Sequence, residues 1–164
     1  LKQHPSVPPQ NLELEIVETS ALEDLETISG VIRECQKLGV TFSLDDFGTG
    51  FSSLSYLRRL PVERLKIYMS FVRGMLVDAN DFAIVEGVLG LARSFGLDVI
   101  AEGVETEEHS ARLLEIGCLL GQGYGIARPM RGESVPAWAK NWTSSKRPVD
   151  EVPFVNPSEH SSSE

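Results

Sequence analysis

The sequence predicts an α/β protein built on parallel strands. Short stretches with strand-like alternation occur at five places, and amphipathic helical stretches separate them. Strands that alternate with helices are usually joined as parallel neighbours by right-handed crossovers. A length of 164 residues is also enough to bury a hydrophobic core. These observations are typical of two architectures, an open doubly wound sheet and part of a (β/α)8 barrel.

The first elements follow from the spacing of apolar residues. Residues 12–17 are apolar at every second position, which indicates a strand. Apolar residues three and four apart over 22–38 indicate a helix, and Gly39 is a suitable residue to end it. The apolar residues of 40–44 predict the second strand.

The middle of the chain repeats this order. A short helix is expected over 52–60, because its start carries serines that can cap it and Pro61 follows its end. A brief strand is expected over 64–67. The apolar spacing over 82–95 then predicts a longer helix that ends at Gly96.

The last elements are a strand over 97–101, a helix over 106–116 and a strand over 119–123. An apolar stripe over 135–142 predicts one more helix. The composition then changes to Ser, Pro and charged residues, so 143–164 is expected to be a flexible tail.

The charge of the chain excludes several classes of partner. Its 24 acidic and 15 basic residues give a net charge of −9. Binding to a DNA or RNA polymer needs clustered Lys and Arg, so neither polymer is an expected partner. No apolar run approaches the roughly 18 residues of a membrane span, and we expect a cytoplasmic domain. Cys35 and Cys118 are expected to be reduced thiols in the core.

Polar and mostly acidic residues follow the expected strands. In both architectures, ligands bind at the carboxyl ends of the strands. Converging carboxylates repel one another unless a cation lies among them. The alternative is that strands simply end in polar loops. The residues at these ends are Glu15 and Glu18, Asp45 and Asp46, Lys66, Glu102 and Glu105, and Gln122.

Oxygen donors of this kind favour Mg²⁺ or Mn²⁺ over Zn²⁺. The three histidines do not suggest otherwise, because His4 and His160 lie near the chain ends and His109 is expected on a helix surface. Asp45 and Asp46 could each contact a metal ion, and two such ions clamp the attacking and leaving oxygens of a phosphodiester. Lys66 could offset charge on the phosphate.

A glycine-rich turn follows the two aspartates. The segment Gly48-Thr49-Gly50 precedes a helix and could hold a phosphate, but a plain tight turn is the favoured explanation. Asp46-Phe47-Gly48 also matches the DFG motif of protein kinases. The other kinase motifs do not accompany it, so that interpretation is rejected.

Several motifs in register resemble those of EAL domains, the bacterial cyclic-di-GMP phosphodiesterases. The resemblance extends from about residue 12 to residue 142. Its motifs are Glu13-Leu14-Glu15-Ile16-Val17-Glu18, Leu44-Asp45-Asp46-Phe47-Gly48-Thr49-Gly50-Phe51-Ser52-Ser53-Leu54, Leu65-Lys66-Ile67, Ala101-Glu102-Gly103-Val104-Glu105-Thr106, and Gln122-Gly123-Tyr124.

The resemblance implies a (β/α)8 barrel of EAL type, incomplete here with about five strands, that hydrolyses cyclic-di-GMP to linear pGpG. Glu15 and Asp45 would bind one Mg²⁺ or Mn²⁺ ion and Asp46 a second. Lys66 would contact the attacking water or the phosphate, and Glu102 would be a general base or metal-linked acid. Substrate-binding or supporting positions would be Glu18, Gly48, Gly50, Glu105 and Gln122.

The sequence departs from the family pattern in two ways. The Glu-Ala-Leu strand and the next strand, with its metal-binding Asn, would precede Leu1. We therefore expect 12–142 to be the C-terminal part of an EAL barrel and 1–11 a linker or truncated upstream segment. Tyr68 stands where active relatives usually have Asp. It is either a tolerated substitution or a sign of a weakened second metal site.

Two functions follow from the resemblance. The parent domain is expected to be a phosphodiesterase, while the isolated chain is expected to lack turnover. The alternative is a degenerate EAL module that binds cyclic-di-GMP or a partner protein without hydrolysis. The resemblance also implies an upstream sensory or GGDEF-type domain, a homodimer of the intact protein, and a parent that an upstream segment could anchor to the inner membrane.

Overall fold

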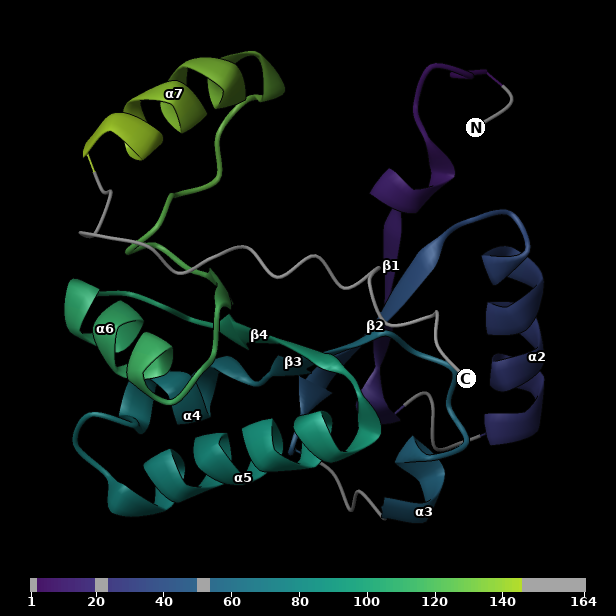
Figure 1. The fold of residues 1–164 in the computed structure, drawn as a ribbon, viewed down its shortest axis with the longest axis horizontal. Coiled ribbons are helices and arrows are strands. Elements are labelled where there is room, and N and C mark those ends of the chain that lie inside the picture. Colours follow the sequence, from purple (N-terminus) through teal and green to yellow (C-terminus); the bar gives the residue numbers. More distant parts are fainter. Residues whose placement is uncertain (1–2, 20–23, 50–53, 146–164) are drawn as a thin grey trace, which may run out of the picture. The chain divides into compact units, whose positions relative to one another are not determined.

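The computed structural model describes residues 3–19, 24–49 and 54–145 (Figure 1). Residues up to Arg128 form one compact unit, and a second unit begins at Pro129. The second unit contains η2 (Gly132–Ser134) and α7 (Val135–Ser145), and the rings of Trp138 and Trp142 pack 5.5 Å apart on α7.

The first unit contains one sheet of five parallel strands. They are β1 (Glu13–Val17), β2 (Thr41–Phe47), β3 (Arg64–Ile67), β4 (Asp98–Glu102) and β5 (Leu120–Gln122). Their order in the sheet is their order in the chain. A doubly wound sheet reverses its strand order at a switch point, whereas a barrel does not. The five predicted strands are thus confirmed, and their order is that of part of an α/β barrel.

Helices connect these strands. A short 3-10 helix, η1 (Pro9–Asn11), precedes β1. The helices of this unit are α2 (Leu25–Gln36), α3 (Leu54–Leu57), α4 (Met69–Gly74), α5 (Ala79–Phe95) and α6 (Glu107–Glu115). Figure 1 shows α2 beside β1 and β2 and α5 along β3 and β4. None of the helices in the described ranges is long and apolar enough to cross a membrane.

The core lies between the strands and the helices. Leu44, Leu65, Ile67 and Ala101 of the sheet are fully buried, as is Val85 of α5. Successive strand residues point to opposite faces. The residues that alternate with these apolar ones, such as Lys66, therefore point to the other face of the sheet.

The structure corrects several element boundaries. Strand β2 continues to Phe47 rather than ending at residue 44, because Asp45 still pairs with Val17 and Phe47 pairs with Ile67 across an irregularity in the ladder. Helix α5 begins three residues earlier than the apolar spacing predicts, since Asp78 accepts a hydrogen bond from the Asn80 amide at 2.8 Å. Of the helix expected over 52–60, the structure shows α3 (Leu54–Leu57), and residues 52 and 53 lie outside the described ranges.

Two further expectations were wrong or incomplete. His109 is buried rather than on the surface, because its ring nitrogens lie against Thr106 and the Arg73 carbonyl oxygen. Helix α4 was not predicted, since six residues are too few to show a helical period. Both cysteines are free, and Cys118 is buried while Cys35 is half-buried at the edge of the core.

Candidate metal centre

Lys66 lies at the centre of a group of carboxylates. Its side chain is only 3% exposed, and its ammonium group reaches carboxylates on three other strands. Lys66 Nζ lies 2.6 Å from Glu15 Oε1, 3.0 Å from Asp45 Oδ1 and 2.7 Å from Glu102 Oε1. Because β1, β2 and β4 each supply one carboxylate, this group forms only when the sheet is assembled.

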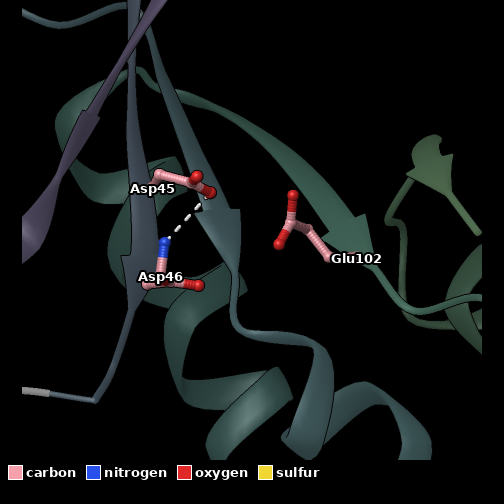
Figure 2. A group of neighbouring side chains, drawn as sticks. All are labelled: Asp45, Asp46 and Glu102. Carbon is pink, nitrogen blue, oxygen red and sulfur yellow. Dashed lines mark hydrogen bonds between the residues drawn. The ribbon is translucent and has the colours of Figure 1, made fainter.

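Three carboxylates of the same site point toward one another. Figure 2 shows Asp45 and Asp46 at the end of β2 facing Glu102 at the end of β4. One oxygen from each of these side chains lies within 4.8 Å of the other two. The Asp46 amide donates a hydrogen bond to Asp45 Oδ1 at 3.1 Å, which orients the neighbouring carboxylate.

Asp46 can point into the site because its backbone departs from the regular strand conformation. Its φ of +57° is the only positive value at a non-glycine residue in the described part of the chain. Asp tolerates this left-handed conformation better than most residues, but the conformation still costs about 1–2 kcal/mol. Both aspartates thereby approach Glu102, although adjacent strand residues normally point to opposite faces.

The site shifts the protonation equilibria of two groups. Burial raises the pKa of the Glu102 carboxyl, and repulsion from Asp45 and Asp46 adds to this, while Lys66 opposes it. Burial alone would lower the pKa of Lys66. The hydrogen bonds to Glu102, Glu15 and Asp45 outweigh that effect, so the pKa of Lys66 is raised and the ammonium stays charged.

The turn after Asp46 is held by a buried carboxylate. Glu18 is fully buried, and its Oε2 accepts a hydrogen bond from the Gly48 amide at 3.0 Å. The Asp46 carbonyl oxygen accepts a hydrogen bond from the Thr49 hydroxyl at 2.9 Å. Gly48 has a φ of +101°, which explains why a glycine is needed there. Gly50 lies outside the described residues.

Of two further predicted residues, Gln122 and Glu105, only one contacts the carboxylates around Lys66. Gln122 does, because its Nε2 donates to Glu102 Oε1 at 2.5 Å. Glu105 does not, because its carboxylate instead pairs with Arg73 at 2.8 Å. Of the sequence-predicted residues, those that contact Lys66 or Glu102 directly are therefore Glu15, Asp45 and Gln122.

Sequence reasoning missed a tyrosine near this turn. Tyr56 of α3 is buried, and burial followed by the negative charge of Glu18 raises the pKa of its phenol. The hydroxyl of Tyr56 and Oε1 of Glu18 have no hydrogen-bond partner among the described residues. No local sequence signal pairs these residues, since they lie on different elements.

The donor set fits a divalent cation of the Mg²⁺ or Mn²⁺ type. Glu15, Asp45, Asp46 and Glu102 bring four negative charges to a site where Lys66 supplies one positive charge. Carboxylate oxygens are the preferred ligands of Mg²⁺ and Mn²⁺, and no His or Cys belongs to the carboxylate group found within the described residues.

Known proteins resemble this chain in both sequence and fold. The EAL domain family matches residues 1–129. The bifunctional diguanylate cyclase/cyclic di-GMP phosphodiesterase MucR of Pseudomonas aeruginosa is 41% identical over 132 residues, which are 80% of this chain and 19% of MucR. The chain thus spans about a fifth of that relative.

Solved structures agree with this match. A complex of the MucR phosphodiesterase with c-di-GMP superposes with a TM-score of 0.76 and 40% identity, covering 81% of this chain and 54% of that one. A manganese and c-di-GMP complex of Klebsiella pneumoniae BlrP1 gives a TM-score of 0.70 and 31% identity, covering 76% and 32%. The predicted fold class is confirmed, and the chain belongs to the EAL domain family.

Proposed function

We propose that this chain forms part of a phosphodiesterase that hydrolyses cyclic-di-GMP to linear pGpG with Mg²⁺ or Mn²⁺. The main support is the convergence of Glu15, Asp45 and Glu102 on Lys66, with Asp46 alongside. Related solved structures add support, since MucR was solved with c-di-GMP and BlrP1 with manganese and c-di-GMP.

Each residue has a proposed role. Glu15 and Asp45 would hold one metal ion and Asp46 a second, since Asp45 and Asp46 both face Glu102. When bound, the ions would polarise the phosphodiester and lower the pKa of a water molecule. Glu102 would accept a proton from the attacking water or serve as a metal-linked acid, and its raised pKa suits proton transfer.

Lys66 would act on the phosphate side of the reaction. Its ammonium is held by three carboxylates and stays charged, so it can stabilise negative charge on the phosphate or orient the attacking water. Gln122 would orient Glu102 through its 2.5 Å hydrogen bond. Glu18 would hold the turn through Gly48. Gly50, outside the described residues, would be a substrate-binding or supporting position.

We also propose the domain organisation and context of the chain. Residues 12–142 would be the C-terminal part of an EAL barrel and 1–11 a linker or upstream segment. The tail expected over 143–164 begins too early, because α7 continues to Ser145, and its remaining residues lie outside the described ranges. Coverage supports a partial barrel, since the chain matches 54% of the solved MucR phosphodiesterase. An upstream GGDEF-type domain fits the double activity in the name of MucR. A homodimer of the intact protein and a cytoplasmic location complete the proposal.

The test is an assay for pGpG. The intact parent protein, incubated with cyclic-di-GMP and Mg²⁺ or Mn²⁺, should form pGpG in a chromatographic assay, and Glu102→Gln should reduce the rate at least about 100-fold. Glu115→Gln, on the exposed side of α6, is the matched control and should be neutral. A folded parent protein that binds the nucleotide but forms no pGpG would contradict the proposal.

The same assay tests whether the 164-residue chain carries a complete active site. The purified 164-residue chain should show no turnover, because the proposed active site needs ligands from the remainder of the barrel. Turnover by the chain alone would show that the described residues are sufficient.

The second candidate is a module that binds cyclic-di-GMP or a protein without hydrolysis. Tyr68 favours it, since a neutral phenol is a poor ligand for Mg²⁺ and this ring packs edge-on against Phe71, with centroids 5.9 Å apart. Tyr68→Asp distinguishes the two candidates in the parent protein. A large gain in rate would indicate a degenerate site, and an unchanged rate would support the enzyme.

A further inference from the structure

Helix α4 follows Lys66 almost directly and is firmly anchored. Val72 at its centre is fully buried in the core. At its end, the Asp81 side chain of α5 packs directly against Gly74, in the space that a Cβ atom on residue 74 would take. At its start, the Tyr68 amide approaches the Phe47 carbonyl oxygen at 3.5 Å. The position of α4 is thus fixed relative to β2, β3 and α5.

One side chain of α4 supports the turn that follows Asp46. A Cβ atom built on Gly48 would lie 3.1 Å from Cε2 of Phe71, so the Phe71 ring rests directly against the backbone of this turn. Tyr68 packs against the same ring. The turn is therefore held from two directions, by Phe71 and by the hydrogen bond from Gly48 to Glu18.

Two other residues of α4 support the loop that follows Glu102. A Cβ atom on Gly103 would lie 2.8 Å from the Met69 Cβ, which is closer than carbon atoms approach, so loop and helix are in direct contact. Two positions later, Glu105 pairs with Arg73 at 2.8 Å. The ring of His109 on α6 lies 3.3 Å from the Arg73 carbonyl oxygen, which ties α6 to the same helix (Figure 1).

Stability alone does not explain the Arg73–Glu105 pair. The two side chains are 46% and 41% exposed, and ion pairs with such exposure contribute little to folding. The pair instead fixes the loop three residues after Glu102, a carboxylate that must lie within hydrogen-bond reach of Lys66 and Gln122.

We propose that α4 is a positioning platform for the two segments that leave the site, with Phe71 setting the turn that follows Asp46 and Arg73 setting the loop that follows Glu102. The consequence for catalysis rests on the proposed function, but the placement of the loops does not. Arg73 and Phe71 are positioning residues, since both act through backbone and neighbouring side chains.

Amide hydrogen exchange in the 164-residue chain tests the platform without any enzymatic assay. Arg73→Gln should increase exchange about 2- to 5-fold at the amides of 103–106 and leave the Gly48 amide unchanged. Phe71→Ala should do the opposite, releasing the Gly48 amide and sparing 103–106. Phe71→Leu, which keeps an apolar side chain, should restore most of the protection if Phe71→Ala proves unstable.

Lys37→Gln is the control for Arg73→Gln. It removes another exposed ion pair, Lys37–Glu34 at 2.6 Å, at the end of α2. It should change the melting temperature as little as Arg73→Gln does and leave both loops protected. The charge exchange Arg73→Glu with Glu105→Arg should recover protection that either single change loses.

The outcomes separate the platform from the proposed function. Equal exchange in Arg73→Gln and wild type, or loss of protection spread over the whole chain, would overturn the platform whatever the enzymatic activity. Selective loss and recovery by the charge exchange would support it even if the parent protein formed no pGpG.

Discussion

At the scale of single residues, Lys66 controls the site. A buried ammonium among three carboxylates is stable only because all three partners are present, and the carboxylates in turn depend on it. Removal of one partner from a buried group of charges is costly, since the other charges remain without compensation. Lys66 and the carboxylates should therefore respond strongly to substitution and to divalent metal.

Lys66→Met should make the chain less stable in the absence of metal. We expect a loss of about 3 kcal/mol in the free energy of unfolding, measured by urea denaturation in EDTA. MnCl₂ should restore part of the loss, because a cation would again lie among the carboxylates. Lys37→Met is the control, since Lys37 pairs with Glu34 at 2.6 Å but both side chains are about two-thirds exposed or more. Equal effects of the two substitutions would contradict the prediction.

Mn²⁺ binding should weaken as the pH falls. The pKa of Glu102 is raised above its usual value, so this carboxylate takes up a proton at a higher pH than an exposed glutamate does. Protonation removes one negative charge from the group, and affinity for Mn²⁺ measured by calorimetry should decrease through that range. Glu102→Gln should bind Mn²⁺ more weakly throughout and with a flatter pH dependence. An identical pH profile in wild type and variant would contradict the contribution of Glu102 to Mn²⁺ binding.

At the scale of elements, the site depends on loops that pack without side chains between them. Gly123 follows β5 and lies against the backbone of Val104 in the loop after β4. The Val104 amide donates to the Gln122 carbonyl oxygen at 3.1 Å, and its own carbonyl accepts from the Gly125 amide at 2.9 Å. These contacts bring Gln122 to Glu102.

Gly123→Ala should therefore be destabilising, by about 2 kcal/mol or more, because a Cβ atom would overlap the Val104 backbone. Gly87→Ala is the control. Gly87 lies on α5 with nothing within 4 Å of an added Cβ, so alanine should stabilise the chain by about 0.5–1 kcal/mol. Thermal and urea denaturation measure the stability change of each variant. A neutral Gly123→Ala would show that the two loops can separate without cost.

At the scale of the whole molecule, β1 and β5 are the two edges of the described sheet. Edge strands present unpaired amide and carbonyl groups and can pair with another chain. Exposed apolar residues lie at these edges, among them Leu14 of β1 and Leu119 and Leu120 at β5. The 164-residue chain by itself is therefore expected to self-associate.

Sedimentation velocity over a range of concentrations should detect this association. Leu119→Lys should weaken it, because a charge at a strand edge opposes pairing. Leu38→Lys is the matched control, as Leu38 is similarly exposed (63% against 71%) but follows α2 rather than a strand edge. Association that both substitutions weaken equally would place the contact elsewhere.

The sequence determined the elements and the chemistry of their ends. Strand and helix periods are local signals, so the five strands and the longer helices were predictable, and Asp45-Asp46 and Glu102 could be placed at strand ends. Short or irregular features were less predictable. Helix α4 has too few residues for a period, and β2 extends beyond its apolar residues because its neighbours continue to pair with it.

Only the tertiary structure decided which side chains meet. Lys66 contacts Glu15 across 51 residues of sequence, and His109 is buried by a contact with Arg73, 36 residues earlier. Tertiary contacts also hold Asp46 in a left-handed conformation and direct Glu105 to Arg73 instead of the metal site. Such contacts depend on how elements far apart in sequence pack together, and no local pattern encodes that packing.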